Sequence, residues 1–344
     1  MDNQKKINNL WIVFVLEIVI YFVTAVVLNI LNSYDITLPT MVTLVLSEVI
    51  LLIPVVIYMR INGLKSAKEL GYHSIKIGTI FMTALLGLLV MPIASFVNIL
   101  TQFFVSNTMV QASDQLTDAP IIVVIFITGV LAPVIEEFIF RGVMNTGFKK
   151  YITPLGAAVV SSIMFGLMHL NINQTCYAIV LGLIFAIVNE ASGSVLTSTI
   201  IHIVINTVNM AMLVVTNAAL DQVDVDLVES TESVRQNTAM LGMMAVVYFV
   251  MALICGCLGY LCVKWIAKHE GRTEDLIKMF ARKTTNEDIT NDADEAEKND
   301  SELEPAENSA TKLHVYRNIP AIISIILCIV IMFVLDPLMK MITK

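Results

Sequence analysis

The sequence predicts an all-α, polytopic transmembrane helix bundle of about eight to nine spans. Of its 344 residues, 57% are hydrophobic and only 15% are charged, and the mean hydropathy is +0.79. Ordinary globular domains have roughly 45–50% apolar and 25% charged residues. Runs of about 20 apolar residues recur from Leu10 almost to Lys344, and a helix of that length matches the hydrocarbon core of a bilayer. The composition therefore excludes a soluble protein.

Nine apolar segments are predicted as spans. The first follows Lys5 and Lys6, but it is longer than a signal-peptide core and lacks a cleavage site of small residues, so we expect it to be retained. The predicted boundaries are 10–31, 38–59, 78–104, 120–146, 154–170, 174–190, 194–217, 238–267 and 319–340.

The positive charges of the connections predict the orientation. Two Lys residues precede the first span, none lies in 32–37, four Lys or Arg residues follow the second span, none lies in 105–119 and two follow the fourth span. Because cytoplasmic connections carry the excess of Lys and Arg, we expect a cytoplasmic N-terminus, in the plasma membrane if the source is prokaryotic. The net charge of −8 without a basic run argues against nucleic acid as a partner.

The polar connections divide the chain into five parts. Within one of them, residues 287–307 contain ten acidic residues and one Lys, and this stretch is predicted to be disordered. The parts are N-terminal spans with an interfacial loop (1–119), a transmembrane core (120–217), an acidic loop with the eighth span (218–267), a cytoplasmic acidic segment (268–318) and a C-terminal span (319–344).

Ionisable side chains are rare in the spans, and several of them cluster in the core. A charged group within a bilayer is costly, so such residues are candidates for function by default. The fourth span contains Glu136, Glu137 and Arg141. Glu137 and Arg141 are four residues apart on one helical face and are expected to pair, whereas Glu136 points about 100° away and needs another partner.

Histidines in two further spans supply such partners. His169 ends the fifth span, and the midpoint between Glu136 and His169 falls in the turn between their spans, so an antiparallel hairpin places both at one depth. His202 and Asn206 share one face of the seventh span, about 13–20 Å in from the cytoplasmic end. We therefore expect these four residues to meet.

Each of these pieces has a simpler interpretation. A Glu–Arg pair in a helix is most often a structural ion pair, and a lone intramembrane histidine most often packs between helices. The combination on three spans favours function, because one Ser or Thr would connect helices at lower cost. Glu17 and Glu48, in the first two spans, are predicted to make polar contacts between helices or to lie at interface positions, with a gating or ion-pathway role as the alternative. Glu190, at a span end, is expected to be solvated.

Three motifs in this region resemble those of a known family. In their order and spacing they are similar to the motifs of the CPBP family of intramembrane proteases, which joins type II CAAX prenyl endopeptidases with bacteriocin-processing and immunity proteins. The resemblance covers roughly residues 120–210 and implies an all-helical core with an interior catalytic cavity. The motifs are Glu-Glu-x-x-x-Arg (Glu136, Glu137, Arg141), Phe-x-x-x-His (Phe165, His169) and His-x-x-x-Asn (His202, Asn206).

The resemblance also implies roles for the four central residues. Glu136 and His169 would activate the attacking water, and His202 with Asn206 would stabilise the oxyanion of the tetrahedral intermediate. A mechanism without a metal cofactor is preferred, because an Asn next to the second histidine suits an oxyanion donor better than a zinc ligand. The alternative is a zinc site formed by Glu136, His169 and His202, with a fourth position left for water.

The remaining motif residues, Glu137, Arg141 and Phe165, are expected to support the site. The implied activity is an intramembrane endopeptidase, with membrane lipids around it and a peptide or protein substrate that is lipidated or a membrane-bound precursor. One alternative is a non-catalytic member that binds a partner in immunity or signalling. A second is a proton-coupled transporter, because intramembrane Glu and His also form proton relays, although the sequence has no repeated halves.

Overall fold

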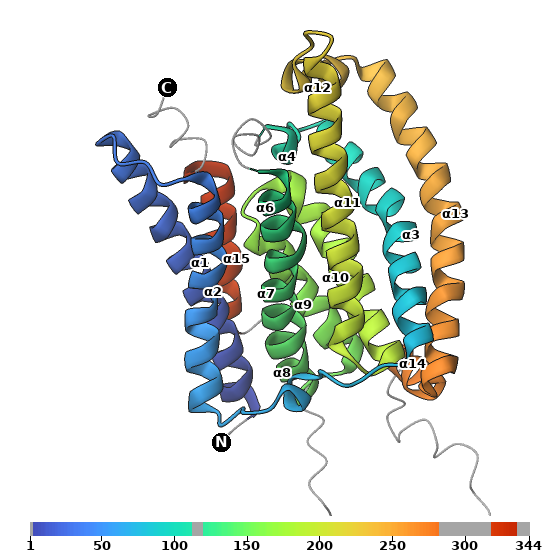
Figure 1. The fold of residues 1–344 in the computed structure, drawn as a ribbon. Helices are drawn as coiled ribbons and strands as arrows, with labels where there is room; N and C mark the ends of the chain where they lie inside the picture. The colour runs from blue at the N-terminus through green and yellow to red at the C-terminus, as the bar shows by residue number, and fades with distance from the viewer. Residues whose placement is uncertain (1–2, 112–119, 282–317, 336–344) are drawn as a thin grey trace, which may run out of the picture.

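A computed structural model describes residues 3–111, 120–281 and 318–335 (Figure 1). These residues form helices and no strands, which confirms the predicted all-α polytopic bundle. Seven helices are long and apolar enough to cross a membrane, so the chain is an integral membrane protein. They are α1 (Asn3–Ser33), α2 (Thr40–Ile61), α3 (Ile77–Gln102), the continuous helix Ile121–Lys149, α10 (Ile172–Ser192), α11 (Val195–Asp221) and α13 (Thr238–Glu270).

Two of the nine predicted spans are shorter apolar helices. The helix α9 (Pro154–Met168) has 15 residues, which is about 22 Å of helix against about 30 Å of hydrocarbon. The last one, Ile319–Val334, comprises α15 (Ile319–Val330) and the start of the π-helical turn η5 (Ile331–Leu335). Positions 336–340 of the ninth predicted span and the acidic stretch 287–307 lie outside the described residues.

Short helices lie at the two ends of the bundle (Figure 1). One end carries the N-terminus of α1, α8 and α14, and it is the end predicted to be cytoplasmic; the other carries α4 and α12. The predicted interfacial loop after α2 forms one 3-10 turn. The bounds are η1 (Ala67–Leu70), α4 (Thr108–Gln111), α12 (Leu227–Gln236) and α14 (Thr273–Phe280).

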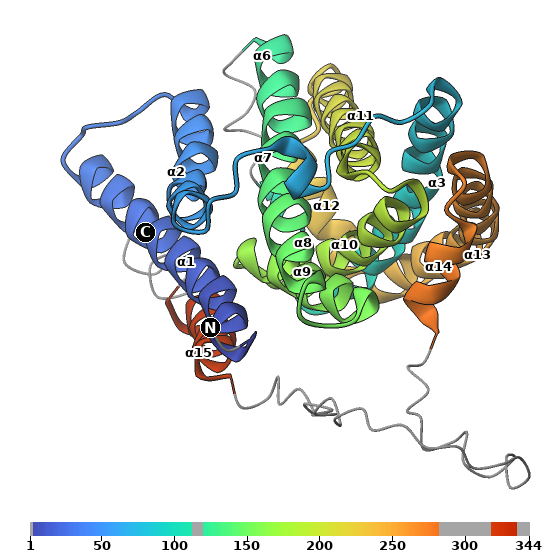
Figure 2. The same cartoon turned by 90° about the horizontal axis from the view of Figure 1, so that it is seen from below.

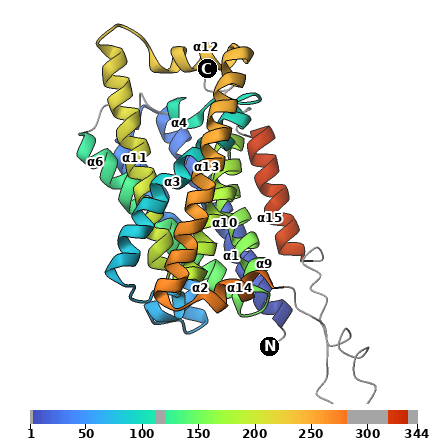
Figure 3. The same ribbon diagram turned by 90° about the vertical axis from the view of Figure 1, so that its right-hand side faces the viewer.

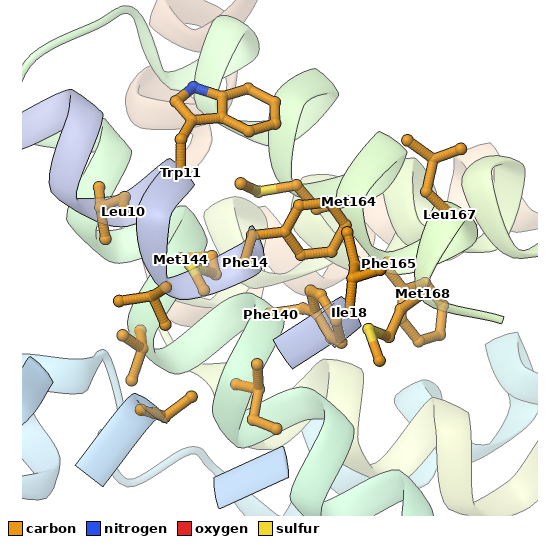
Figure 4. Close-up of a cluster of buried hydrophobic side chains, with 14 of the residues drawn as sticks. Leu10, Trp11, Phe14, Ile18, Phe140, Met144, Met164, Phe165, Leu167 and Met168 are labelled. Atoms are coloured by element: carbon orange, nitrogen blue, oxygen red, sulfur yellow. The ribbon is translucent and has the colours of Figure 1, made fainter. Parts of the chain in front are cut away.

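Two groups of helices flank a central group (Figures 2 and 3). The helices α1, α2 and α15 lie on one side, and α13 packs along α3 on the other. Between them, α9 and α11 pack against the continuous helix Ile121–Lys149, and α10 packs against α9, α11 and α3. Figure 4 shows side chains of α1, among them Phe14 and Ile18, against Phe140 and Phe165 of the centre. Because lipid tails are as apolar as these side chains, close van der Waals packing holds the groups together.

The continuous helix Ile121–Lys149 contains two π-helical stretches, which are frequent at functional sites. One of them has a clear cause in the sequence. Pro133 has no N–H, so one carbonyl of the preceding turn, that of Gly129 in α-helical or of Thr128 in π-helical geometry, has no helical donor. Side chains of α11 replace it: the Asn206 amide donates to the Thr128 carbonyl and the Thr207 hydroxyl to the Gly129 carbonyl, both at 3.3 Å. The segments are α6 (Ile121–Phe126), η2 (Ile127–Leu131), α7 (Ala132–Glu137), η3 (Phe138–Asn145) and α8 (Thr146–Lys149).

Candidate active site

A buried carboxylate connects the fourth span to α11. Oε1 of Glu137 lies 3.2 Å from Nη1 of Arg141 and 3.1 Å from Nδ1 of His202, and the Glu137 and Arg141 side chains are 0% exposed. The pairing of Glu137 with Arg141 matches the expectation from their spacing. Because a carboxylate held by a guanidinium only accepts hydrogen bonds, Nδ1 of His202 carries its proton toward Glu137. The ring of His202 therefore has a fixed orientation.

The Arg141 guanidinium lies between aromatic rings. Its Cζ is 4.3 Å from the ring centre of Phe165 and 5.2 Å from that of Phe185. A cation over an aromatic face is stabilised by the ring quadrupole, and more so away from water. Gly182 on α10 makes room for this arrangement, because a Cβ there would come within 2.8 Å of Nη2 of Arg141. Arg141 is thus a packed internal cation with one carboxylate partner.

His169 follows the last residue of α9 and faces the same aromatic ring. The Phe165 ring meets the rings of His169 and His202 edge to face, with centroids 5.2 and 5.6 Å apart. Nδ1 of His169 lies 2.9 Å from the Phe165 carbonyl oxygen. A carbonyl only accepts, so Nδ1 carries the proton and Nε2 of the neutral ring has a free lone pair. Nε2 of His169 can therefore accept a proton.

Glu136 lies on another face of α7 and is the more accessible of the two acids. Its Oε2 is 3.5 Å from Nε2 of His202, and its side chain is 17% exposed. The structure thus brings Glu136 to His202; among the described residues it contains no ion pair between Glu136 and His169.

Asn206, the fourth predicted residue, lies one turn beyond His202 on α11. It donates to the Thr128 carbonyl of the fourth span. An amide nitrogen has two N–H groups, so this bond holds the side chain in place and uses only one of them. All three motifs therefore converge where α7, α9 and α11 meet.

Comparison with known proteins agrees with this arrangement. Residues 118–208 match the family model of type II CAAX prenyl endopeptidase Rce1-like proteins. The predicted family resemblance is confirmed. No match was found among the curated proteins or among the solved structures. The Rce1-like segment contains every motif residue, and at the family level it supports a CAAX-type intramembrane protease.

Two acids outside the Rce1-like segment lie in α1 and α2. Glu48 lies on α2, which packs against α7, the helix that carries Glu136. Oε2 of Glu48 is buried without a hydrogen-bond partner in the described chain. Glu17 is 1% exposed and neither of its oxygens has a partner there, so the expected interhelical polar contact is absent for Glu17. Sequence reasoning noted both acids, but no pattern relates the second span to the fourth.

Sequence reasoning missed Tyr72, which lies in the connection before α3. The Gly71 carbonyl accepts from the N–H of Val195, and the hydroxyl of Ser194 bonds the backbone of His73, so this connection is fastened to the start of α11. The Tyr72 ring lies beside Gly142 of the fourth span, because a Cβ there would be 3.5 Å from its Cε2. Burial, and then the negative charge of Glu137, raise the pKa of Tyr72 to about 12. A neutral hydroxyl therefore lies close to the Glu137 carboxylate.

The prediction that Glu190 is solvated is wrong. This carboxylate, at the end of α10, is only 9% exposed and forms ion pairs with Lys149 of α8 and Arg272. Arg272 also donates to the Glu190 carbonyl at 3.2 Å. The cause is tertiary, because α8 and α14 both pack over this end of α10 and α9. The ion pairs close the end of the bundle below the motif residues.

The possible zinc ligands do not form a metal site in this arrangement. In residues 3–111, 120–281 and 318–335, no group of three or more His, Cys, Asp and Glu side chains is arranged to hold a metal ion. Instead His202 directs its two ring nitrogens to Glu136 and Glu137. A carboxylate at Nδ1 is also the usual partner of a zinc-bound histidine, so the metal content is a matter for measurement.

Proposed function

We propose that this protein is an intramembrane endopeptidase that hydrolyses a peptide bond in a membrane-held peptide or protein, with a prenylated C-terminal peptide as the first substrate to test. The observation that supports it best is the partly exposed Glu136 carboxylate beside His202, whose ring is fixed by the fully buried Glu137. This group lies inside the Rce1-like segment.

In the proposed reaction Glu136 takes a proton from a water molecule, assisted by the lone pair on Nε2 of His169. The water oxygen attacks the scissile carbonyl carbon and gives a tetrahedral oxyanion. The protonated Nε2 of His202 and the free N–H of Asn206 stabilise that oxyanion. When the C–N bond breaks, the leaving nitrogen takes the proton that Glu136 had accepted. Each proton therefore returns to its starting group or leaves with a product.

Glu137 and Arg141 stay out of the proton transfers in this mechanism. Both are fully buried and paired with each other. Glu137 keeps Nδ1 of His202 protonated, and Arg141 balances the charge of Glu137. The site can then hold two neighbouring acids in different states, one fixed as a structural anion and one free to accept a proton.

The decisive experiment compares Glu136→Gln with wild type in proteoliposomes. The substrates are fluorogenic peptides with the same sequence, one with a farnesylated C-terminal CAAX motif and one without the lipid. The glutamine variant should lose activity by a factor of about 100 or more while keeping its helical circular dichroism. Glu232→Gln, in α12 at an end of the bundle (Figure 1), is the matched control and should cleave at the wild-type rate.

Two outcomes would overturn the proposal. Equal cleavage by Glu136→Gln and wild type would remove Glu136 from the chemistry. A folded wild type that cleaves neither peptide, nor any membrane peptide of the producing cell, would favour a non-catalytic protein that binds a membrane partner.

The choice of mechanism without a metal is tested separately. We expect purified, active protein to contain no stoichiometric zinc and to keep its activity after treatment with a membrane-permeant chelator. Stoichiometric zinc whose removal abolishes cleavage, and whose return restores it, would replace this mechanism with a metalloprotease mechanism.

A further inference from the structure

We infer that Asn171 is a positioning residue that fixes His169 against the other motif residues. This inference rests on the proposed function, because it gives His169 a part in the reaction. Asn171 lies outside the three motifs, two residues after His169, at the point where α9 ends and α10 begins. It starts the second helix and also holds the end of the first.

The side chain of Asn171 uses its whole hydrogen-bonding capacity. Its Nδ2 donates to the His169 carbonyl at 3.0 Å and to Oε1 of Gln174 at 2.5 Å. Its Oδ1 accepts from the N–H of Gln174 at 2.8 Å and from the Thr108 hydroxyl at 3.2 Å. An amide has two N–H donors and two acceptor lone pairs, so all four are occupied. Such a fully bonded side chain has one orientation.

The turn that Asn171 closes needs this support. Leu170, between His169 and Asn171, has a φ of 52°, a left-handed conformation that costs about 1 kcal/mol or more for a residue other than glycine. The His169 carbonyl also belongs to the last turn of a helix, where carbonyls have no partner within the helix. The bond from Asn171 satisfies that carbonyl and holds the Leu170 turn. The backbone of His169 is therefore fixed from outside its own helix.

Fixing this backbone also fixes the ring. Nδ1 of His169 is already tied to the Phe165 carbonyl one turn earlier in α9, so the ring moves with the end of the helix. Loss of the Asn171 bond would let the last turn of α9 unwind and carry Nε2 away from the reacting atoms. A displacement of about 1 Å in a catalytic group can cost about 100-fold in rate.

The neighbouring Asn173 offers a matched control. It is 1% exposed, and it belongs to the same polar group: its amide donates to the Thr101 hydroxyl at 2.8 Å, and its Oδ1 accepts from the N–H of Thr108 at 3.3 Å. Its bonds therefore join α10 to α3 and α4, as one bond of Asn171 does, but none of them reaches His169. Substitution of either residue would loosen this end of the bundle, whereas only substitution of Asn171 would displace His169.

The test separates helix capping from positioning. In Asn171→Asp the carboxylate still caps α10 and accepts from Gln174 and Thr108, because Asp is as good an N-cap as Asn. It can no longer donate to the His169 carbonyl or to Oε1 of Gln174, but the Gln174 amide can turn to offer its N–H to the carboxylate instead. We expect kcat for the peptide substrate to fall by about 10- to 100-fold, with KM within about twofold of wild type and an unfolding midpoint that falls no further than in Asn173→Ala. Asn173→Ala should lower the unfolding midpoint and keep kcat within about twofold of wild type.

A second measurement does not depend on turnover. The ring nitrogen signals of His169, assigned by their loss in His169→Gln, should shift in Asn171→Asp and stay in place in Asn173→Ala in spectra of protein labelled with ¹⁵N-histidine. Wild-type kcat together with unmoved His169 signals in Asn171→Asp overturns this inference and leaves the proposed function intact. A wild type without any cleavage overturns the proposed function, and the catalytic part of this inference with it.

Discussion

The His202 ring is held by Glu137, the acid that the solvent does not reach: Nδ1 lies 3.1 Å from Oε1, and the side chains are 5% and 0% exposed. The accessible acid, Glu136, lies at the opposite nitrogen of the same ring. One imidazole therefore separates two adjacent carboxylates that have different surroundings. Changes at the two acids should have different consequences.

Glu137→Gln should lower stability, unlike Glu136→Gln. Removing the charge of Glu137 leaves the Arg141 guanidinium buried without its carboxylate, and breaking a buried pair from one side costs about 3–5 kcal/mol. Thermal unfolding in detergent should show a large drop in midpoint for Glu137→Gln and little change for Glu136→Gln. A wild-type midpoint in Glu137→Gln would mean that Arg141 finds another partner.

Gly182→Ala should destabilise the site through packing alone. The added Cβ would lie 2.8 Å from Nη2 of Arg141 and 3.0 Å from Cβ of Ser162, and overpacking a fixed interior costs about 1–3 kcal/mol. We expect a lower unfolding midpoint and slower cleavage. Gly242→Ala in α13 is the control, because nothing lies within 4 Å of its Cβ position. Equal behaviour of the two variants would contradict the close packing around Arg141.

Glu190→Gln should loosen α14. The neutral side chain loses its ion pairs to Lys149 and Arg272 at a position that is 9% exposed, so the loss should exceed the 0.2–1 kcal/mol that is typical of exposed pairs. Limited proteolysis from the α14 side should be faster than in wild type. The control is Glu274→Gln. Its ion pair with Lys278 is exposed, so losing that pair should leave the limited-proteolysis pattern unchanged.

Tyr72 should make stability fall at alkaline pH. Its pKa is raised from 10.0 to about 12 in the folded protein by burial and by the charge of Glu137, so the unfolded chain loses this proton first. The contribution is fully present below pH 10 and is lost as the pH rises toward about 12. Tyr72→Phe should reduce the fall in unfolding midpoint over this interval. A variant that follows the wild-type curve would show that Tyr72 titrates as in a free chain.

The helical elements could be predicted from the sequence because a bilayer imposes a length on apolar runs. The pairing of Glu137 with Arg141 was predictable for a similar reason, since residues four apart share a helical face. The predicted span 154–170 was already short, and α9 ends two residues earlier, at Met168, because the left-handed turn at Leu170 follows it.

The contacts between distant segments could not be predicted. The Glu190 side chain meets Lys149 and Arg272, which lie 41 and 82 residues away, and no periodicity encodes such a distance. The contact of His202 with Glu137 was not predicted. Helical spacing shows which residues share a face of α11, but it does not show how that face is rotated relative to α7. Asn171 did leave a signal in the sequence: an Asn with a Gln three residues later is a capping pattern, and it follows His169 almost directly.

Pro133 has a consequence for how the helices are aligned along the membrane. The backbone of Pro133 has no hydrogen to donate, and Asn206 and Thr207 donate to carbonyls of the turn before it, so a slip of α11 by one turn would break both bonds in an environment without water. The proline thereby helps to fix the depth at which α11 lies in the membrane. The level at which His202 meets the two glutamates is set by an atom that is missing from the neighbouring helix.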